Sequence, residues 1–246
     1  MAGRDVYPID LFECGKMQCD VVGGSIEGLR SLANDTPDRF GVGRGGLWKL
    51  TYADIWLETE QEYRAWRALR ARQRNGSGVM VVPVLRRLWF AQALGVPADQ
   101  IPHSDGTFFS DGAGYAGQTI GASLTAAAAH GATEIQVRIL GAQPLQGAEP
   151  FTIVHPVAEA RLYEVAGVNA MADVVVSGQV VGYDYTIEIN PPLREPTAAG
   201  TELDFDNPRC LMRLADPNGM SYEEDIVSFS SVTFLEELRV LSGATV

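Results

Sequence analysis

The chain has 246 residues, 46% of them apolar, which is enough for one large domain or two smaller ones with a buried core. Its formal net charge of −12 argues against non-specific nucleic-acid binding and against anionic membranes. No apolar run reaches the roughly 18 residues that span a bilayer, and the start MAGRDVYPID lacks the apolar core of a signal peptide. Three cysteines without such a signal are typical of a reduced, intracellularly made protein.

Glycine-rich turns and few helix-period segments predict a mainly β chain. Residues 6–13 (VYPIDLFE) predict a strand, at a sheet edge because of Pro8. A turn over residues 14–16 is expected to lead into a return strand at 17–24 (MQCDVVGG). Residues 23–46 are rich in Gly, Asp, Asn and Pro and show no clear periodicity, which predicts a functional loop or a disordered arm.

The segment GGLWKLTYADIWLETEQEYRAWRALRARQRNG, from Gly45 to Gly76, begins as a strand. Its side chains alternate between two faces from Leu47, and three aromatic residues strengthen the prediction: Trp48, Tyr52 and Trp56. The later stretch GVMVVPVLRRLWF, residues 78–90, predicts a buried strand.

A helix is predicted between these two strands, over residues 60–75. Thr59 followed three residues later by Glu62 is a capping box, which places the helix start at Glu60. The pair Asn75-Gly76 is a typical left-handed helix end. An apolar face suited to packing on a sheet carries three residues at helical spacing: Tyr63, Trp66 and Leu69.

Positive charge is concentrated on this helix. Seven arginines and two glutamates lie between Thr59 and Phe90, so this stretch carries +5 and the remainder of the chain carries −17. The arginines of the helix are Arg64, Arg67, Arg70, Arg72 and Arg74. Opposite charges across a repeated contact set the register of neighbouring subunits, so these arginines are candidate subunit-interface residues. A solvated helix face is the alternative explanation.

From about Ala91 to residue 207, short strand-like segments recur every 10 to 15 residues with Gly or Pro between them. They are TEIQVRIL, EPFTIVHP, ARLYEVAGV, DVVVSGQVVGYDYTIEI and TELDFD. This rhythm predicts an antiparallel barrel or sandwich, while TAAAAHGA is a loop or one helical turn. Two more strands surround the turn DPNG near the end of the chain and are expected to return to the first domain. We therefore predict one β domain from residues 1–90 and 208–246, with 91–207 inserted as a second.

Residues suited to catalysis are few. The three histidines are isolated in the sequence: His103, His130 and His155. His103, Ser104 and Asp105 are adjacent, and adjacent residues do not generally orient one another as a nucleophile, base and orienting group must. No residue cluster therefore indicates an enzyme, and no catalytic residue is predicted.

Metal-ligand patterns are equally weak. Cys14 and Cys19 are spaced C-x4-C with only Cys210 elsewhere, whereas a zinc site takes four ligands, so apolar packing is the preferred explanation. Oxygen ligands are available from Asp105, Ser110 and Asp111, but the spacing is not that of an EF-hand, and turn chemistry is preferred. We predict no metal and no cofactor.

The segment from Gly45 to Val84 resembles the strand–helix–strand unit of distal tail proteins from long-tailed, siphovirus-type bacteriophages and related prophages. The shared features are a strand with Trp after Gly-Gly, a helix bearing AWRA and a following strand. Further similar segments are DGTFFSDGAGY, RLYEV, INPPLREPTAAGTEL and PRCLMRLADPNG, so the resemblance extends over most of the chain.

This resemblance implies a split β-barrel related to tail-tube subunits, with one flanking helix and an inserted antiparallel β domain. It implies a homo-hexameric ring that connects the tail tube to the hub and to tail-tip or baseplate proteins. The implied partners are the tail tube, hub and tape-measure proteins of the same virion, with no specific nucleic acid and no membrane. The implied location is the virion tail tip, after synthesis in the host cytoplasm.

Two other functions stay open from the sequence. The β-rich insertion is a candidate carbohydrate-binding module for host-surface attachment, in which four aromatic residues stack on sugars: Trp89, Phe108, Phe109 and Tyr115. Core packing is the other explanation for these aromatics. Several distal tail proteins carry a lectin-like domain at the C-terminus, whereas the second domain here is an insertion. A hydrolase with an unrecognised site is the third possibility.

Overall fold

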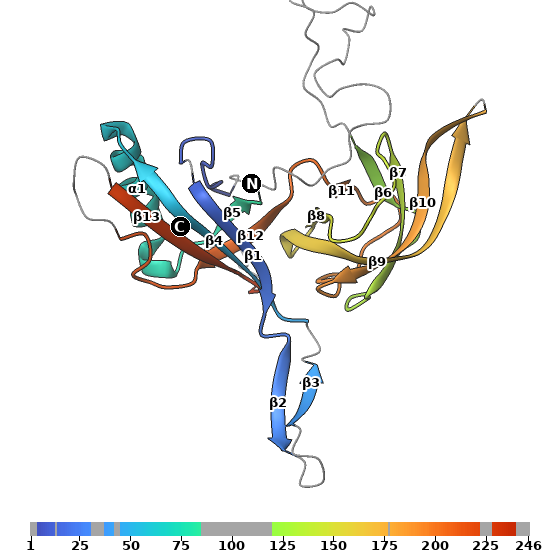
Figure 1. The fold of residues 1–246 in the computed structure, drawn as a ribbon, viewed down its shortest axis with the longest axis horizontal. Coiled ribbons are helices and arrows are strands. Elements are labelled where there is room, and N and C mark those ends of the chain that lie inside the picture. The colour runs from blue at the N-terminus through green and yellow to red at the C-terminus, as the bar shows by residue number, and fades with distance from the viewer. Residues whose placement is uncertain are drawn as a thin grey trace, which may run out of the picture. The chain divides into compact units, whose positions relative to one another are not determined.

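The computed structural model describes residues 4–12, 14–30, 37–41, 45–84, 120–176, 178–221 and 228–239. The chain divides into two compact units, Met1–Val84 with Arg209–Val246, and Leu85–Pro208. Each unit contains an antiparallel sheet (Figure 1). The prediction of a mainly β chain is confirmed.

The sheet of the first unit has five strands, and its central strands come from both ends of the chain. Their order is β1 (Cys14–Val22), β4 (Leu47–Leu57), β13 (Ser228–Glu236), β12 (Arg209–Leu214) and β5 (Met80–Pro83). All neighbouring pairs are antiparallel. Because β13 and β12 lie between β4 and β5, the N-terminal residues cannot complete this sheet without the C-terminal strands.

The predicted edge strand over residues 6–13 is wrong. Among the described residues 6–12, only Val6 forms a strand pairing, an isolated parallel bridge to Val81, and the chain then turns. Tyr7 lies in the core, stacked on Tyr52 with 5.3 Å between ring centroids. The expected turn over residues 14–16 is also wrong, because β1 begins at Cys14.

Strand β4 changes its buried face halfway along. In its first half Trp48, Leu50 and Tyr52 are buried. A β-bulge at residues 53–54 then shifts the alternation, so that the buried residues of the second half are Ile55 and Leu57. At the change, Asp54 has a φ of 55° and the register with β13 shifts between Ser230 and Val232. Consequently Trp56, which regular alternation places with Trp48 and Tyr52, is 49% exposed.

Helix α1 (Glu60–Arg72) begins where the sequence predicts. Thr59 Oγ1 accepts a hydrogen bond from the backbone N–H of Glu62 at 3.3 Å, and a carboxylate oxygen of Glu62 accepts from the Thr59 N–H at 3.0 Å. The predicted end at residue 75 is wrong, because the α-helix stops at Arg72 and a 3-10 turn, η1 (Arg74–Gly76), follows. The Gln73 carbonyl accepts from both Gly76 and Gly78, which tightens this turn.

Loss of the cap is expected to weaken the first unit. Thr59→Ala removes the acceptor for the Glu62 N–H, which should lower the free energy of unfolding by about 0.5–2 kcal/mol. Urea denaturation followed by circular dichroism measures the change. Thr59→Ser keeps an acceptor oxygen and should be close to neutral, so an equal loss in both variants would contradict a capping role.

A two-stranded ribbon follows β1, formed by β2 (Ser25–Arg30) and β3 (Pro37–Gly41). The loop or disordered arm expected over residues 23–46 therefore contains regular structure. Gly46, with a φ of +84°, immediately precedes β4, where the chain returns to the five-stranded sheet. A Cβ atom there would lie 2.6 Å from the Val22 carbonyl oxygen, so only glycine fits this approach.

The second unit contains a six-stranded sheet that nearly closes into a barrel, which settles the predicted choice between barrel and sandwich. The strand order is β11 (Leu203–Asp204), β8 (Pro150–His155), β9 (Glu159–Val176), β10 (Gln179–Asn190), β7 (Glu134–Leu140) and β6 (Gly121–Leu124). The two outer strands approach through a bridge between Ser123 and Glu202 and a 2.9 Å hydrogen bond from Leu124 N to Thr201 O.

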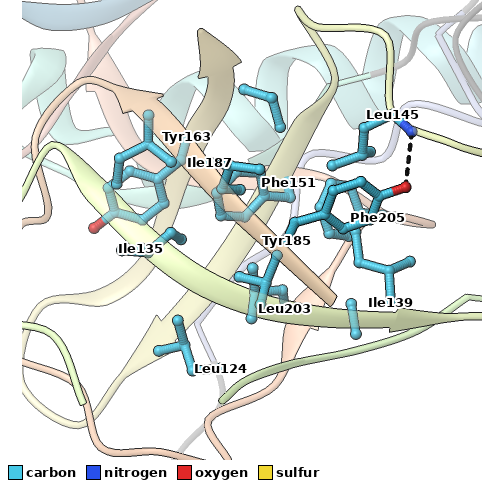
Figure 2. Packing of buried hydrophobic residues seen from close by; sticks show 14 of the residues in the cluster. Leu124, Ile135, Ile139, Leu145, Phe151, Tyr163, Tyr185, Ile187, Leu203 and Phe205 are labelled. Carbon is cyan, nitrogen blue, oxygen red and sulfur yellow. Dashed lines mark hydrogen bonds between the residues drawn. The ribbon is translucent and has the colours of Figure 1, made fainter. Parts of the chain in front are cut away.

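Inward-facing side chains fill the barrel, as the close view in Figure 2 shows. Tyr185 lies among them, and its hydroxyl oxygen accepts a 3.2 Å hydrogen bond from Leu145 N. The single strand predicted over residues 173–189 is wrong, because this segment contains the end of β9 and most of β10. The two strands form a hairpin, and Gly178, with a φ of +82°, lies in the turn between them. Strand β6 is not among the predicted strands.

Candidate subunit interface

One side of α1 anchors the helix in the first unit. Trp66 is fully buried, its Nε1–H donates to the Met220 carbonyl at 2.9 Å, and its ring meets Phe12 edge-on with centroids 5.1 Å apart. Leu69 is buried on the same side, while Tyr63 is half-buried. This leaves the opposite side of the helix to solvent.

All five arginines of the helix segment are exposed, and two of them have partners within the chain. Arg64 forms an i,i+4 ion pair with Glu60, and Arg72 Nη1 lies 3.2 Å from Asp5 Oδ1. Each pair is mostly solvent-exposed, so each contributes little to stability. Ion pairs within the chain therefore account for Arg64 and Arg72.

The other three arginines, Arg67, Arg70 and Arg74, form no ion pair within the described residues; we call them the arginine face. Arg67 and Arg70 are three residues apart on the helix, so their side chains are neighbours and their like charges repel. Of these three arginines, only Arg70 lies in the last turn of α1, where the helix dipole favours a cation. The arginine face thus carries charge that the described part of its own chain does not neutralise.

Exposed carboxylates that could meet such a face occur in the same unit. Asp20 lies on the outermost strand β1, Glu27 lies on β2, and Asp10 precedes β1. In the part of the chain that the structure describes, none of the three pairs with a cation; Asp20 accepts a hydrogen bond from Gln18. The unit therefore offers charges of both signs at its surface.

An exposed aromatic pair lies close to the helix in sequence. Trp56 is three residues before the N-cap Thr59, and it is directly opposite Phe229 on the neighbouring strand β13. The two rings meet edge-on with centroids 6.4 Å apart, and Phe229 is 65% exposed. Sequence reasoning missed this pair because it depends on the bulge at Asp54. Exposed aromatics of this kind are enriched at protein interfaces.

The second unit holds a buried polar cluster around His155, which the sequence did not reveal. His155 Nε2 lies 2.8 Å from the Tyr163 hydroxyl, and that hydroxyl also accepts a 3.0 Å hydrogen bond from Arg194 N. Burial lowers the pKa of His155 to about 4; the nearby Glu195 opposes this shift and Arg161 adds to it. The imidazole is therefore neutral at pH 7 and serves as a packed hydrogen-bonding group.

Nine of the residues singled out in the sequence lie in one segment of the chain. The four candidate sugar-stacking aromatics and the polar residues of that region lie in 85–119, outside the described residues: Trp89, Phe108, Phe109, Tyr115, His103, Ser104, Asp105, Ser110 and Asp111.

The structure does place His130 and the three cysteines. His130 is exposed in a turn. The cysteines are free, with Cys19 and Cys210 buried and Cys14 half-buried.

Across the ranges that the structure describes, no group of three or more His, Cys, Asp or Glu side chains is arranged to hold a metal ion. No helix there has the length and apolar character needed to cross a bilayer. The chain matches no protein-family model, and no curated protein is significantly similar to it.

Proposed function

We propose that this chain is a structural component of a bacteriophage tail, a distal tail protein whose copies form a homo-hexameric ring. The ring would connect the tail tube to the hub and tail-tip proteins, with the tape-measure protein as a further neighbour. The observation that carries the proposal is the arginine face, three exposed cations on an acidic chain without ion-pair partners among its described residues.

A contact between neighbouring subunits of a ring would supply ion-pair partners for those cations. In a closed ring, one surface of each subunit meets a different surface of the next, so an arginine face on one copy can meet carboxylates on its neighbour. Guanidinium groups pair bidentately with carboxylates, which fixes orientation as well as adding energy. Asp20 and Glu27 are exposed acids of the first unit that could act as the partners.

The architecture is compatible with a tail-tube-like first unit. This unit has an antiparallel sheet and one helix packed through Trp66. In the sequence, the β-rich second unit is inserted between β5 and β12. The resemblance of Gly45–Val84 to the strand–helix–strand unit of distal tail proteins supports the specific family. The exposed Trp56–Phe229 pair adds an apolar surface that subunit contact would bury.

Electron microscopy of the purified full chain tests the proposal, together with mass measurement of assembled tails. We expect rings with six-fold symmetry and six copies at the distal end of the tail tube. One or three copies per tail would overturn the hexamer. Absence of the chain from purified virions would overturn the tail assignment, and specific binding on a glycan array without ring formation would favour the carbohydrate-binding alternative.

Reversing charge on the arginine face should weaken the ring. Arg67→Glu combined with Arg70→Glu should leave the subunit folded, because both side chains are exposed and unpaired among the described residues. We expect weaker assembly, most strongly at low salt, where repulsion between the introduced glutamates and acids of the neighbour is least screened. Analytical ultracentrifugation at several salt concentrations measures this effect.

A control with the same change in net charge combines Ala127→Glu, Gln136→Glu, Gln143→Glu and Ala199→Glu. All four side chains are exposed and uncharged, and all four residues belong to the second unit, whereas the helix belongs to the first. The control should assemble like the natural chain. Normal assembly of the Arg67→Glu, Arg70→Glu protein at low ionic strength would show that the arginine face is only a solvated surface.

A further inference from the structure

Strand β9 presents a long edge that no other described strand covers. Its first part, Glu159–Glu164, pairs with β8, and Val165 exchanges backbone hydrogen bonds with Ala148 and Glu149. From Ala166 to Val176 the described residues supply only one neighbour, β10, on the opposite edge. Figure 1 shows β9 and β10 running together to the end of their hairpin.

This free edge lacks the features that normally prevent strands from associating. Natural edge strands carry lysine, proline or inward-pointing charges, because their unpaired N–H and C=O groups are a template for another strand. The stretch AGVNAMADVVV, residues 166–176, contains neither lysine, arginine nor proline and has one charge, Asp173. Most of its apolar side chains are exposed, with Met171 at 52% and Val175 at 56%.

The sequence of the edge is complementary to itself when it is read in the opposite direction. Around Met171 the residues are VNAMADV, from Val168 to Val174. In an antiparallel pair centred on Met171, each residue meets a chemically matched one: Val168 meets Val174, Asn169 meets Asp173, Ala170 meets Ala172, and Met171 meets itself. The only charge then lies opposite an amide, and no two carboxylates oppose each other.

We infer that β9 is a docking surface for a second copy of this chain, and that two copies pair their β9 strands antiparallel about a two-fold axis at Met171. The pairing would join the two six-stranded sheets by backbone hydrogen bonds between the free edges. The central residues suit this role, because Ala170–Val174 keep a regular one-to-one register with β10. The register shift beside Ala170 leaves Asn169 opposite no residue of β10, at the margin of the paired region.

The paired side chains have the required chemistry. Asn169 donates one amide hydrogen to Glu134 at 2.8 Å, and its second amide hydrogen is available for the Asp173 carboxylate of the other copy. Half-exposed Met171 side chains would bury apolar surface against each other on the axis. This contact is isologous, whereas a ring contact is heterologous, so it uses a different surface and does not depend on the proposed tail function.

Disulfide crosslinking of the full chain tests the register. Residues that face each other across an antiparallel pair have Cα atoms about 4.5–5.5 Å apart, within the range that a disulfide spans. Met171→Cys should therefore give a covalent dimer under mild oxidation, by joining the introduced residue to itself. Val154→Cys, equally exposed on β8 but not on the free edge, is the matched control and should stay largely uncrosslinked.

Solution mass tests the association itself. Met171→Lys places two cations together on the axis, and its exposed position leaves the fold intact, which circular dichroism checks. Sedimentation should show that the natural chain has twice the mass of Met171→Lys, whether the larger assembly is a dimer or a pair of rings. Val154→Lys should keep the natural mass. Equal crosslinking of both cysteine variants, or equal mass of the natural chain and Met171→Lys, would overturn the inference.

Discussion

Trp66→Ala is expected to lower the free energy of unfolding of the full chain by about 3–5 kcal/mol. The indole ring is fully buried against Phe12, so its removal leaves a cavity and loses an edge-to-face aromatic contact. The variant also leaves the Met220 carbonyl without the Nε1–H donor. Urea denaturation followed by far-ultraviolet circular dichroism measures the change, because that signal does not depend on the deleted fluorophore.

Two further substitutions separate the contributions. Trp66→Phe keeps an aromatic ring but loses the hydrogen bond to Met220, and it should cost about 1–3 kcal/mol. Phe229→Ala removes an exposed ring from the same unit and should change stability by no more than about 0.5 kcal/mol. If Trp66→Ala leaves the unfolding midpoint unchanged, α1 is not held to its unit through Trp66.

The start of α1 was predictable because its signals are local. Thr59 and Glu62 are three residues apart, and both halves of the capping box form as the sequence indicates. The end of the helix depends on Gln73, which is buried and whose carbonyl accepts from Gly76 and Gly78. That arrangement reflects packing in the unit and not the Asn75-Gly76 signal alone, so the prediction extended the helix too far.

The face change in β4 could not be read from its own residues. The alternation of Leu47–Asp54 indicates an uninterrupted strand, but the bulge occurs where β4 pairs with β13, a strand from the other end of the chain. Asp54 adopts its positive φ there and pairs with Lys16 on β1 at 2.8 Å. The exposed Trp56–Phe229 pair follows from these distant contacts.

The cluster of arginines at the candidate interface could be predicted from the sequence, whereas the ion pairs that these arginines form within the chain could not. The cluster of arginines on the helix is a local property of the sequence. The ion pair between Arg72 and Asp5 joins residues 67 positions apart and depends on the fold.

In the second unit, the Ser-Gly step within DVVVSGQVV is a turn signal that the valines on both sides of it obscure. The free edge of β9 exists because that turn makes a hairpin of β9 and β10.

Acidification is expected to destabilise the second unit through His155, over the range from about pH 6.5 to about pH 4. The imidazole is 3% exposed, and burial lowers its pKa to about 4 in the folded chain, against an ordinary value of 6.5. Between these values the unfolded chain binds a proton that the folded chain does not, so stability falls as the pH is lowered. The stabilisation is complete above pH 6.5, and the loss by pH 4 should be about 2–3 kcal/mol.

His155→Gln isolates this contribution, because glutamine retains a side-chain acceptor for the Tyr163 hydroxyl but does not titrate. Urea unfolding at pH 7 and pH 4.5 should show a smaller acid loss in this variant than in the natural chain. His130→Gln, at an exposed turn, should keep the natural acid loss. Arg239 lowers the pKa of Glu237 below the usual range of a carboxyl, so the stability due to Glu237 is lost only at more acidic pH. An unchanged acid loss in His155→Gln would therefore place the titrating group elsewhere and remove His155 as its cause.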